Sequence, residues 1–351
     1  MKQVYIIDYV RTPIAKFQGG LSEVRADDLA AIVLKEIVKI NPQIPAEEIE
    51  DVILGCANQA GEDNRNVARM ASLLAELPIK IGGETVNRLC ASGMAAIANA
   101  YRAIAIGEGD FYIAGGVEQM TRAPYVLSKS AQPFGRDVQL FDSSFGWRFI
   151  NPKMKELYGV DGMGETAENL AEIYKISREA QDEFALLSQQ KATSAQNSGR
   201  LAQEIVNVEI PQKKGEPKIF SEDEFVKPDT TLDKLAKLRP AFKKEGGSVT
   251  AGNSSGLNDG AAAMILASED AVKKYNLKPL AKIISSAVVG VEPRIMGIGP
   301  VEATKKALSR ANLSLEDMDI IELNEAFAAQ ALSVLQELGI DAKDERLNPN
   351  G

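Results

Sequence analysis

The chain alternates short apolar runs with longer helical patterns, and this alternation limits the folds open to it more than any other feature. The strand-like runs and helical patterns follow one another over residues 4–10, 26–40, 51–57, 66–77 and 111–116. Strands that alternate with helices form a sheet with helices on both faces. The run 261–267 is apolar throughout, which is typical of a central strand. We therefore predict an α/β fold.

The middle of the chain departs from this pattern. Two polar helical patterns, 165–174 and 178–198, precede a segment over 211–244 that is rich in lysine, proline and acidic residues. This composition indicates a loop-like insertion outside the main core. The boundaries that we predict are an N-terminal α/β half formed by 1–117 and 246–268, a loop domain over 118–245, and a C-terminal α/β half over 269–351.

The last quarter of the chain repeats the first. The order of helix, loop and strand in residues 34–54 matches that in residues 304–323. A repeat of this length indicates two halves of one architecture. On this alignment the counterpart of Cys90 in the second half falls beyond Gly351, so we expect the second half to be incomplete.

Composition excludes several classes of protein. The net charge of −9 argues against a nucleic-acid binder. Two cysteines, Cys56 and Cys90, are too few for a disulfide framework or a zinc site, which favours a reducing cytoplasm. The longest fully apolar run is far shorter than a membrane span, so we expect a soluble protein without a membrane or metal partner. The chain contains no histidine, the usual base beside a cysteine nucleophile.

Cys90 is the first candidate for chemistry. It follows an extended segment and precedes a run of small residues that opens an apolar helix. The N–H groups and the dipole at a helix start favour a thiolate, and small neighbours admit a bulky acyl group. A lone cysteine is more often a buried core residue. Its setting nevertheless makes Cys90 the predicted acyl-accepting nucleophile, whereas Cys56 is assigned to core packing.

Three further segments carry polar or small residues where a site could form. The loop 246–260 feeds the apolar strand and suits backbone contact with an extended ligand, although a flexible surface loop has the same composition. Asn324 either caps a helix or orients a water or oxyanion at the end of a strand. Met163 precedes a helix, where methionine is more often packing than pocket.

Together these segments resemble the thiolases, the acyl-CoA C-acetyltransferases. The resemblance runs in order through VRTPIAKFQGGL, VNRLCASGMAA, AGGVEQMTRAPY, MGETAENLA, GGSVTAGNSSGLNDGAAA, GIGP and LNEAFAAQ. It implies a five-layer α/β/α/β/α fold of two similar halves plus a loop domain that holds coenzyme A, with the second half incomplete in this chain.

The resemblance also implies roles for single residues. Cys90 corresponds to the acylated nucleophile, and Asn324 to the asparagine that holds an oxyanion-hole water. The residues that it places beside coenzyme A or the acyl chain are Met163, Phe242, Ala251, Ser254, Ser255 and Phe327. It further implies CoA thioesters as substrates, no permanently bound cofactor, and a homodimer or homotetramer.

The implied reaction is a two-step exchange. The Cys90 thiolate attacks a 3-oxoacyl-CoA, acetyl-CoA leaves, and free coenzyme A collects the acyl group; the reverse condenses two acetyl-CoA. Fatty-acid metabolism and β-oxidation are the expected setting. At Gly162 many short-chain members carry a histidine, so a longer acyl chain becomes plausible.

Two departures put activity of this chain in doubt. Thiolases continue past the counterpart of Gly351 with a Gly-His-Pro segment and a Cys-x-Gly segment, which supply the activating histidine and a proton shuttle. We therefore expect this chain to be inactive and less stable than a longer form. The alternatives are a catalytically dead fragment that binds CoA or partner subunits, and a related condensing enzyme of the ketoacyl-synthase type, against which the NEAF and GNSSGLNDGAAA segments argue.

Overall fold

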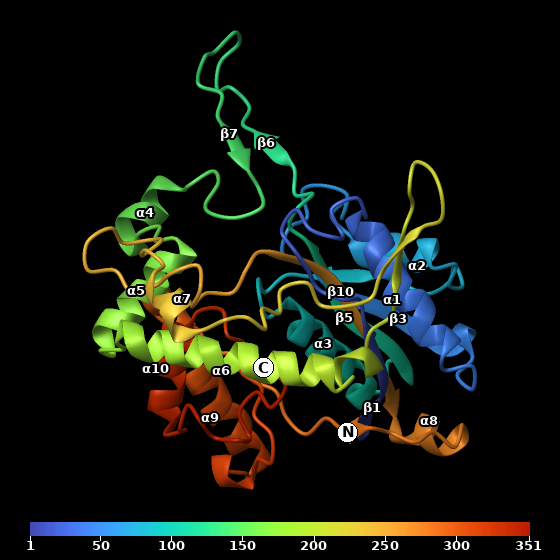
Figure 1. The fold of residues 1–351 in the computed structure, drawn as a ribbon. Helices are drawn as coiled ribbons and strands as arrows, with labels where there is room; N and C mark the ends of the chain where they lie inside the picture. Colours follow the sequence, from blue (N-terminus) through green and yellow to red (C-terminus); the bar gives the residue numbers. More distant parts are fainter. The chain divides into compact units, whose positions relative to one another are not determined.

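The computed structural model describes residues 1–351, and the contacts within it divide the chain into two compact units. Figure 1 shows the elements of both. Unit 1 contains residues 1–145, 201–225 and 257–283, and unit 2 contains residues 146–200, 226–256 and 284–351. These two units have different boundaries from the three predicted domains. The domain boundaries stay a prediction.

Unit 1 is built on one seven-stranded mixed sheet in the order β11–β1–β10–β5–β3–β4, with β2 paired to β10. β10 is antiparallel to β1 and β5, whereas β5, β3 and β4 run parallel. The strands are β1 (Val4–Arg11), β2 (Ala15–Lys16), β3 (Ile49–Gly55), β4 (Glu84–Val86), β5 (Phe111–Gln119), β10 (Asn258–Ser268) and β11 (Ala281–Lys282). The predicted central strand over 261–267 is confirmed, because β10 lies between β1 and β5.

Helices cover both faces of this sheet (Figure 1). Helices α1 (Ala26–Lys39) and α2 (Val67–Leu74) pack on one face, and α3 (Ser92–Ile106) packs on the other. Successive strand residues point to opposite faces, so Ile265 joins the core beside α1 while Leu266 joins the core beside α3. Both residues are fully buried, which accounts for the apolar side chains at these two positions of the run.

The predicted helices form close to their expected bounds. In α1, Asp27 and Asp28 lie in the first turn and Lys39 in the last, where their charges complement the helix dipole. The predicted pattern over 66–77 becomes α2, capped by the Asn66 side chain, which accepts a hydrogen bond from the backbone N–H of Arg69. The two predicted polar helices are observed as α5 (Met163–Ile173) and α6 (Arg178–Asn197).

Part of the predicted insertion belongs to the core of unit 1. Arg11 donates from Nε to Glu204 at 2.7 Å and from both terminal nitrogens to Asp223 at 2.7 and 2.8 Å. These charge-assisted bonds tie the 201–225 segment to β1, and Val208 and Phe220 enter the main core. Composition alone missed this, since long-range ion pairs leave no local signal.

The remaining elements of unit 1 are short. Two hairpins lie outside the main sheet, one of β6 with β7 and one of β8 with β9. The bounds are η1 (Ala46–Glu48), β6 (Tyr125–Leu127), β7 (Leu140–Asp142), η2 (Leu201–Gln203), β8 (Val208–Ile210), β9 (Lys218–Phe220) and α8 (Glu269–Lys274).

Unit 2 is built from helices and long loops. One of its apolar clusters joins α5 to α10 (Ala328–Leu338) and to the start of α9 (Gly299–Ala311) through Leu170, Val301 and Val334. Besides α5 and α6, its elements are α4 (Pro152–Tyr158), α7 (Leu232–Ala236), η3 (Pro293–Ile298), α9 (Gly299–Ala311), η4 (Leu315–Asp317) and α10 (Ala328–Leu338). Unit 2 contains no strand, so the only sheets besides the seven-stranded one are the two hairpins of unit 1.

The internal repeat is therefore only partly reproduced. The helix and the 3-10 turn of the first copy, α1 and η1, have counterparts in α9 and η4. The strand predicted over 320–323 is wrong, because a strand requires neighbours that pair along its length. Ile321 has one isolated bridge, to Leu347. The corresponding β3 lies between β5 and β4.

One helix is long and apolar enough to span a membrane by length and composition alone, over Leu89–Ile106. This finding is weak evidence, because core helices of soluble proteins satisfy the same criterion. The expectation of a protein without a membrane partner stays a prediction. In unit 1, Ala96, Ala100 and Ile104 of this helix pack against the sheet.

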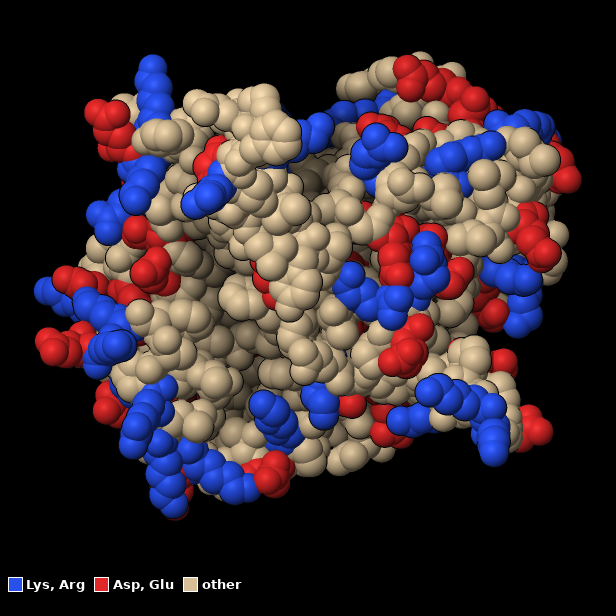
Figure 2. All heavy atoms as spheres, turned by 90° about the horizontal axis from the view of Figure 1, so that it is seen from above, with Lys and Arg blue, Asp and Glu red and all other residues tan.

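Charged side chains of both signs are mixed over the face drawn in Figure 2, with uncharged surface between them. The sequence contains 40 basic and 49 acidic residues. Mixing of signs keeps the local potential modest even though the net charge is negative.

Glycine is required where α3 meets β3. A Cβ added at Gly55 would lie 2.3 Å from the carbonyl carbon of Ser92, whereas one added at Gly93 would meet only the Gly115 oxygen at 3.9 Å.

We predict that Gly55→Ala lowers the free energy of unfolding by roughly 1–3 kcal/mol, because the start of α3 must shift. The matched Gly93→Ala change should be neutral or stabilising, since alanine is the better helix former. Urea denaturation of both variants measures this, and equal stabilities would contradict it.

Candidate active site

Cys90 lies in a tight turn between β4 and α3 in unit 1. Leu89 has a φ of 50°, an uncommon value for a residue with a side chain. The Ser92 hydroxyl accepts from the backbone N–H of Arg88 at 2.8 Å and donates to the Leu89 carbonyl at 2.6 Å. These bonds hold the turn, and the Cys90 side chain is exposed. The N-cap of α3 is Ala91, so Cys90 directly precedes the helix start, close to where we predicted it.

A second set of bonds fixes the turn to the end of β3. Asn87 donates to the Ala57 carbonyl at 3.0 Å and accepts from the Leu89 N–H at 2.9 Å. The Glu118 carboxylate in turn accepts from the N–H groups of Ala57 and Asn58 at 2.8 and 3.0 Å. Burial raises the pKa of Glu118. Sequence reasoning missed Asn87 and Glu118; the signal for Glu118 was an acidic residue at the end of an otherwise apolar strand.

Cys56 differs from Cys90 in its access to solvent. It is buried, and its thiol donates to the Asn58 carbonyl at 2.8 Å. Burial, with the nearby charges of Glu118 and Asp63, raises the pKa of the Cys56 thiol. A thiol kept protonated and out of solvent is a poor nucleophile. The assignment of Cys56 to core packing agrees with this geometry.

All other predicted site residues lie in unit 2, where the loop 246–256 carries three of them. The Glu168 carboxylate of α5 accepts from the N–H groups of Ser248 and Val249, at 2.9 Å in the shorter contact of each. The buried Asn253 accepts from the Thr250 N–H at 2.7 Å and donates to Asp182 of α6 at 2.9 Å. The small-residue loop is thus held by buried polar groups, contrary to the reading of a flexible surface loop.

The same loop pairs with the segment that leads into α10. The Ser255 N–H donates to the Ala326 carbonyl, and the Ala328 N–H donates to the Asn253 carbonyl, both at 2.9 Å. Between these bonds Ser254 and Phe327 form an isolated antiparallel bridge. This pairing brings two predicted contact residues, distant in sequence, side by side.

Aromatic packing brings in the start of α5. The rings of Phe242 and Phe327 are 6.0 Å apart in an edge-to-face arrangement. A Cβ at Gly164 would lie 2.1 Å from the Phe242 ring, so the first turn of α5, with Met163, rests on that ring. Met163 and Phe242 are each about half exposed, at 46% and 45%. The result is an apolar wall that is open to solvent on one side. Ala251 is exposed in the same loop.

Asn324 is not a helix cap, because α10 begins at Ala328 and its N-cap is Phe327. The Asn324 side chain is exposed and makes no hydrogen bond within the chain. Its neighbours are fixed by Asn348, whose side chain bonds Leu323 and Glu325. Sequence reasoning missed Asn348.

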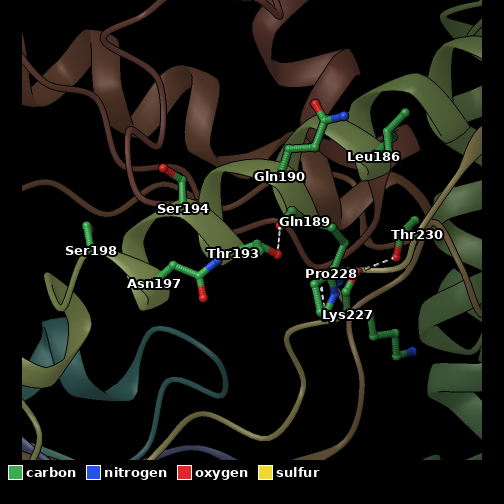
Figure 3. Close-up of a pocket in the computed structure, with 10 residues that line it drawn as sticks. All are labelled: Leu186, Gln189, Gln190, Thr193, Ser194, Asn197, Ser198, Lys227, Pro228 and Thr230. Atoms are coloured by element: carbon green, nitrogen blue, oxygen red, sulfur yellow. Dashed lines mark hydrogen bonds between the residues drawn. The ribbon is translucent and has the colours of Figure 1, made fainter.

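A surface pocket of about 550 Å³ lies elsewhere in unit 2, between the polar face of α6 and residues 227–230 (Figure 3). The Gln189 side chain accepts from the Lys227 N–H at 2.7 Å across it. The lining contains none of the predicted site residues; it consists of Leu186, Gln189, Gln190, Thr193, Ser194, Asn197, Ser198, Lys227, Pro228 and Thr230.

The contrast between the two thiols generates a direct prediction. Iodoacetamide should label Cys90 well before Cys56, because only the first is exposed and the second has a raised pKa. Peptide mass spectrometry at several times resolves the two sites. Cys90→Ser should abolish the fast phase and Cys56→Ser should leave it unchanged. Faster labelling of Cys56 would contradict the assignment.

Comparison with known proteins adds the family. The model of the thiolase N-terminal domain matches residues 4–270, and that of the thiolase C-terminal domain matches residues 277–351. A 3-oxoadipyl-CoA/3-oxo-5,6-dehydrosuberyl-CoA thiolase of Escherichia coli is 57% identical over 351 residues, and a β-ketoadipyl-CoA thiolase of Pseudomonas knackmussii is 59% identical over 350. Each match covers 100% of this chain and 87% of the relative.

A solved structure is similar throughout the chain. The acetyl-CoA acetyltransferase of Bacillus anthracis superposes with a TM-score of 0.92 at 43% identity, covering 100% of this chain and 86% of that one. Because both domain models match, the expectations of a missing C-terminal segment, an incomplete second half and an inactive fragment find no support in these comparisons. The names of these relatives likewise do not support the expected setting in fatty-acid oxidation. The chain belongs to the thiolase family, with an α/β thiolase fold and the acyltransferase activity of that family.

Proposed function

We propose that this protein cleaves 3-oxoadipyl-CoA with coenzyme A, forming succinyl-CoA and acetyl-CoA. The identity of 57–59% to thiolases named for this substrate supports the choice. The observation that carries the chemistry is the exposed Cys90 in its fixed turn before α3.

In the proposed mechanism the Cys90 thiolate attacks C3 of the substrate. The C2–C3 bond breaks, its electron pair leaves with the acetyl-CoA enolate, and a proton completes acetyl-CoA. A four-carbon acyl group with a terminal carboxylate stays on the sulfur. The thiolate of free coenzyme A then takes this acyl group and releases Cys90. The reaction uses CoA thioesters and needs no permanently bound cofactor.

In this proposal, the roles of the unit 2 residues follow from their chemistry. The free amide of Asn324 holds a water that donates to the oxyanion or enolate oxygen. Ser254 and Ser255, exposed in part on a pinned loop, bind the pantetheine arm with Ala251, while Met163, Phe242 and Phe327 supply its apolar wall. At Gly162 an added Cβ would meet only the Glu165 carboxylate at 3.5 Å, which leaves room for a longer acyl chain.

The purified protein should cleave 3-oxoadipyl-CoA with a higher kcat/KM than acetoacetyl-CoA. Mass spectrometry should detect succinyl-CoA, and a succinyl adduct on Cys90 when free CoA is withheld. Cys90→Ser should abolish both.

The chain contains no histidine, so the assays should be run with and without added imidazole. Imidazole should accelerate acylation because it supplies a base. A base held in position within an enzyme is typically worth ~10²–10⁴-fold in rate. Preference for acetoacetyl-CoA would contradict the substrate, and labelling at another residue would contradict the mechanism.

Family resemblance also supports the proposal of a homodimer or homotetramer in the cytoplasm. Sedimentation at micromolar concentration should then give a mass well above the 37.8 kDa of one chain. A monomer at that concentration would contradict the assembly.

A further inference from the structure

We propose that Asn348 is a positioning residue of the reaction, which holds the segment around Asn324 in the conformation that presents the catalytic amide. The inference rests on the proposed function, in which Asn324 binds the oxyanion-hole water. Asn348 itself touches no reacting atom in this role. It acts through the residues on either side of Asn324.

Every polar atom of the Asn348 side chain is used for this segment. Its Oδ1 accepts from the Leu323 N–H at 2.8 Å, and its Nδ2 donates to the Leu323 carbonyl at 2.9 Å. The same Nδ2 donates to Glu325 Oε1 at 2.6 Å. Asn348 is 3% exposed, so water does not compete for these bonds. One buried amide therefore fixes the residue before Asn324 and the residue after it.

The backbone around Asn348 joins the same segment. Its N–H donates to the Ile321 carbonyl, and the Ile321 N–H donates to the Arg346 carbonyl, both at 2.8 Å. Asn348 has a φ of 40°, a region that asparagine tolerates better than most residues. Leu347 beside it is 1% exposed in the core formed with α10. The amide is thus anchored before it binds Leu323 and Glu325.

The consequence concerns the free amide. The chain on both sides of Asn324 is fixed, while the Asn324 side chain forms no hydrogen bond within the protein and stays available. A donor aimed in advance at developing charge needs no reorganisation during the reaction. Displacement of such a group by about 1 Å can cost ~10²-fold in rate. Asn348 therefore supplies the rigidity that the segment lacks as a loop without a strand partner.

The test uses a change of charge at constant size. Asn348→Asp keeps the acceptor for the Leu323 N–H but places a carboxylate against the Leu323 carbonyl and the Glu325 carboxylate. We expect kcat for thiolysis to fall by about tenfold to ~10²-fold, with KM for CoA little changed. At acidic pH one proton shared by the facing carboxylates restores a hydrogen bond, so the deficit relative to wild type should shrink as pH falls.

A double variant and a matched control separate positioning from folding. In Asn348→Asp/Glu325→Gln, the introduced amide can donate to the introduced carboxylate, so part of the lost kcat should return at neutral pH. Asn312→Asp makes the same change at an asparagine of unit 2 that also has a positive φ, 55°, but is exposed, and it should leave kcat unchanged. The proposal would be overturned in favour of a structural role if the loss of kcat in Asn348→Asp did not depend on pH, was not relieved by Glu325→Gln and paralleled a loss of thermal stability.

Hydrogen exchange at the Leu323 amide provides a readout without turnover. Asn348→Asp should accelerate exchange there and shift the side-chain amide resonance of Asn324, and Asn312→Asp should do neither. Unchanged exchange and resonance would overturn the positioning role even if the protein proved inactive. A wild-type protein that fails to cleave 3-oxoadipyl-CoA contradicts the proposed function instead, so the two failures are distinguishable.

Discussion

Burial of one mixed sheet on both faces is the constraint on which unit 1 depends. A strand covered on both sides favours apolar side chains, which accounts for the fully buried Ile265, Leu266 and Ala267 of β10 between β1 and β5. The helices that cover the sheet must also lie close to its strands. Gly55 lets the start of α3 lie directly against β3, and the turn that carries Cys90 is fixed by this contact. The exposure of the Cys90 thiol therefore depends on the packing beneath its turn.

Unit 2 differs from unit 1 because its long loops are ordered without a sheet. Buried side chains with hydrogen-bonding groups take the place of strand partners: Glu168 and Asn253 for the loop 246–256, and Asn348 for the segment before α10. Each satisfies backbone groups that would otherwise be buried without partners. Buried side chains thus order the same segments to which the resemblance assigns contacts with coenzyme A or the oxyanion.

The two cysteines show how environment separates identical groups. Cys56 directly follows β3 in the chain, and there burial and nearby carboxylates disfavour its thiolate. Cys90 is exposed beside the start of a helix. The sequence reasoning distinguished them by local pattern, and the structure supplies the physical cause, which is desolvation of one sulfur and solvent access for the other.

The sequence by itself determined the α/β class, the bounds of α1, α2, α5 and α6, the central place of β10 and the ordered motifs of the family, because each is encoded in local periodicity or in contiguous residues. Only the tertiary structure decided that the segment at 320–323 is not a strand, that Arg11 draws residues 201–225 into the first unit, and that Asn87, Glu118 and Asn348 support the candidate residues. Strand formation and long-range hydrogen bonds depend on partners far away along the chain, and a local pattern contains no information about which partners arrive.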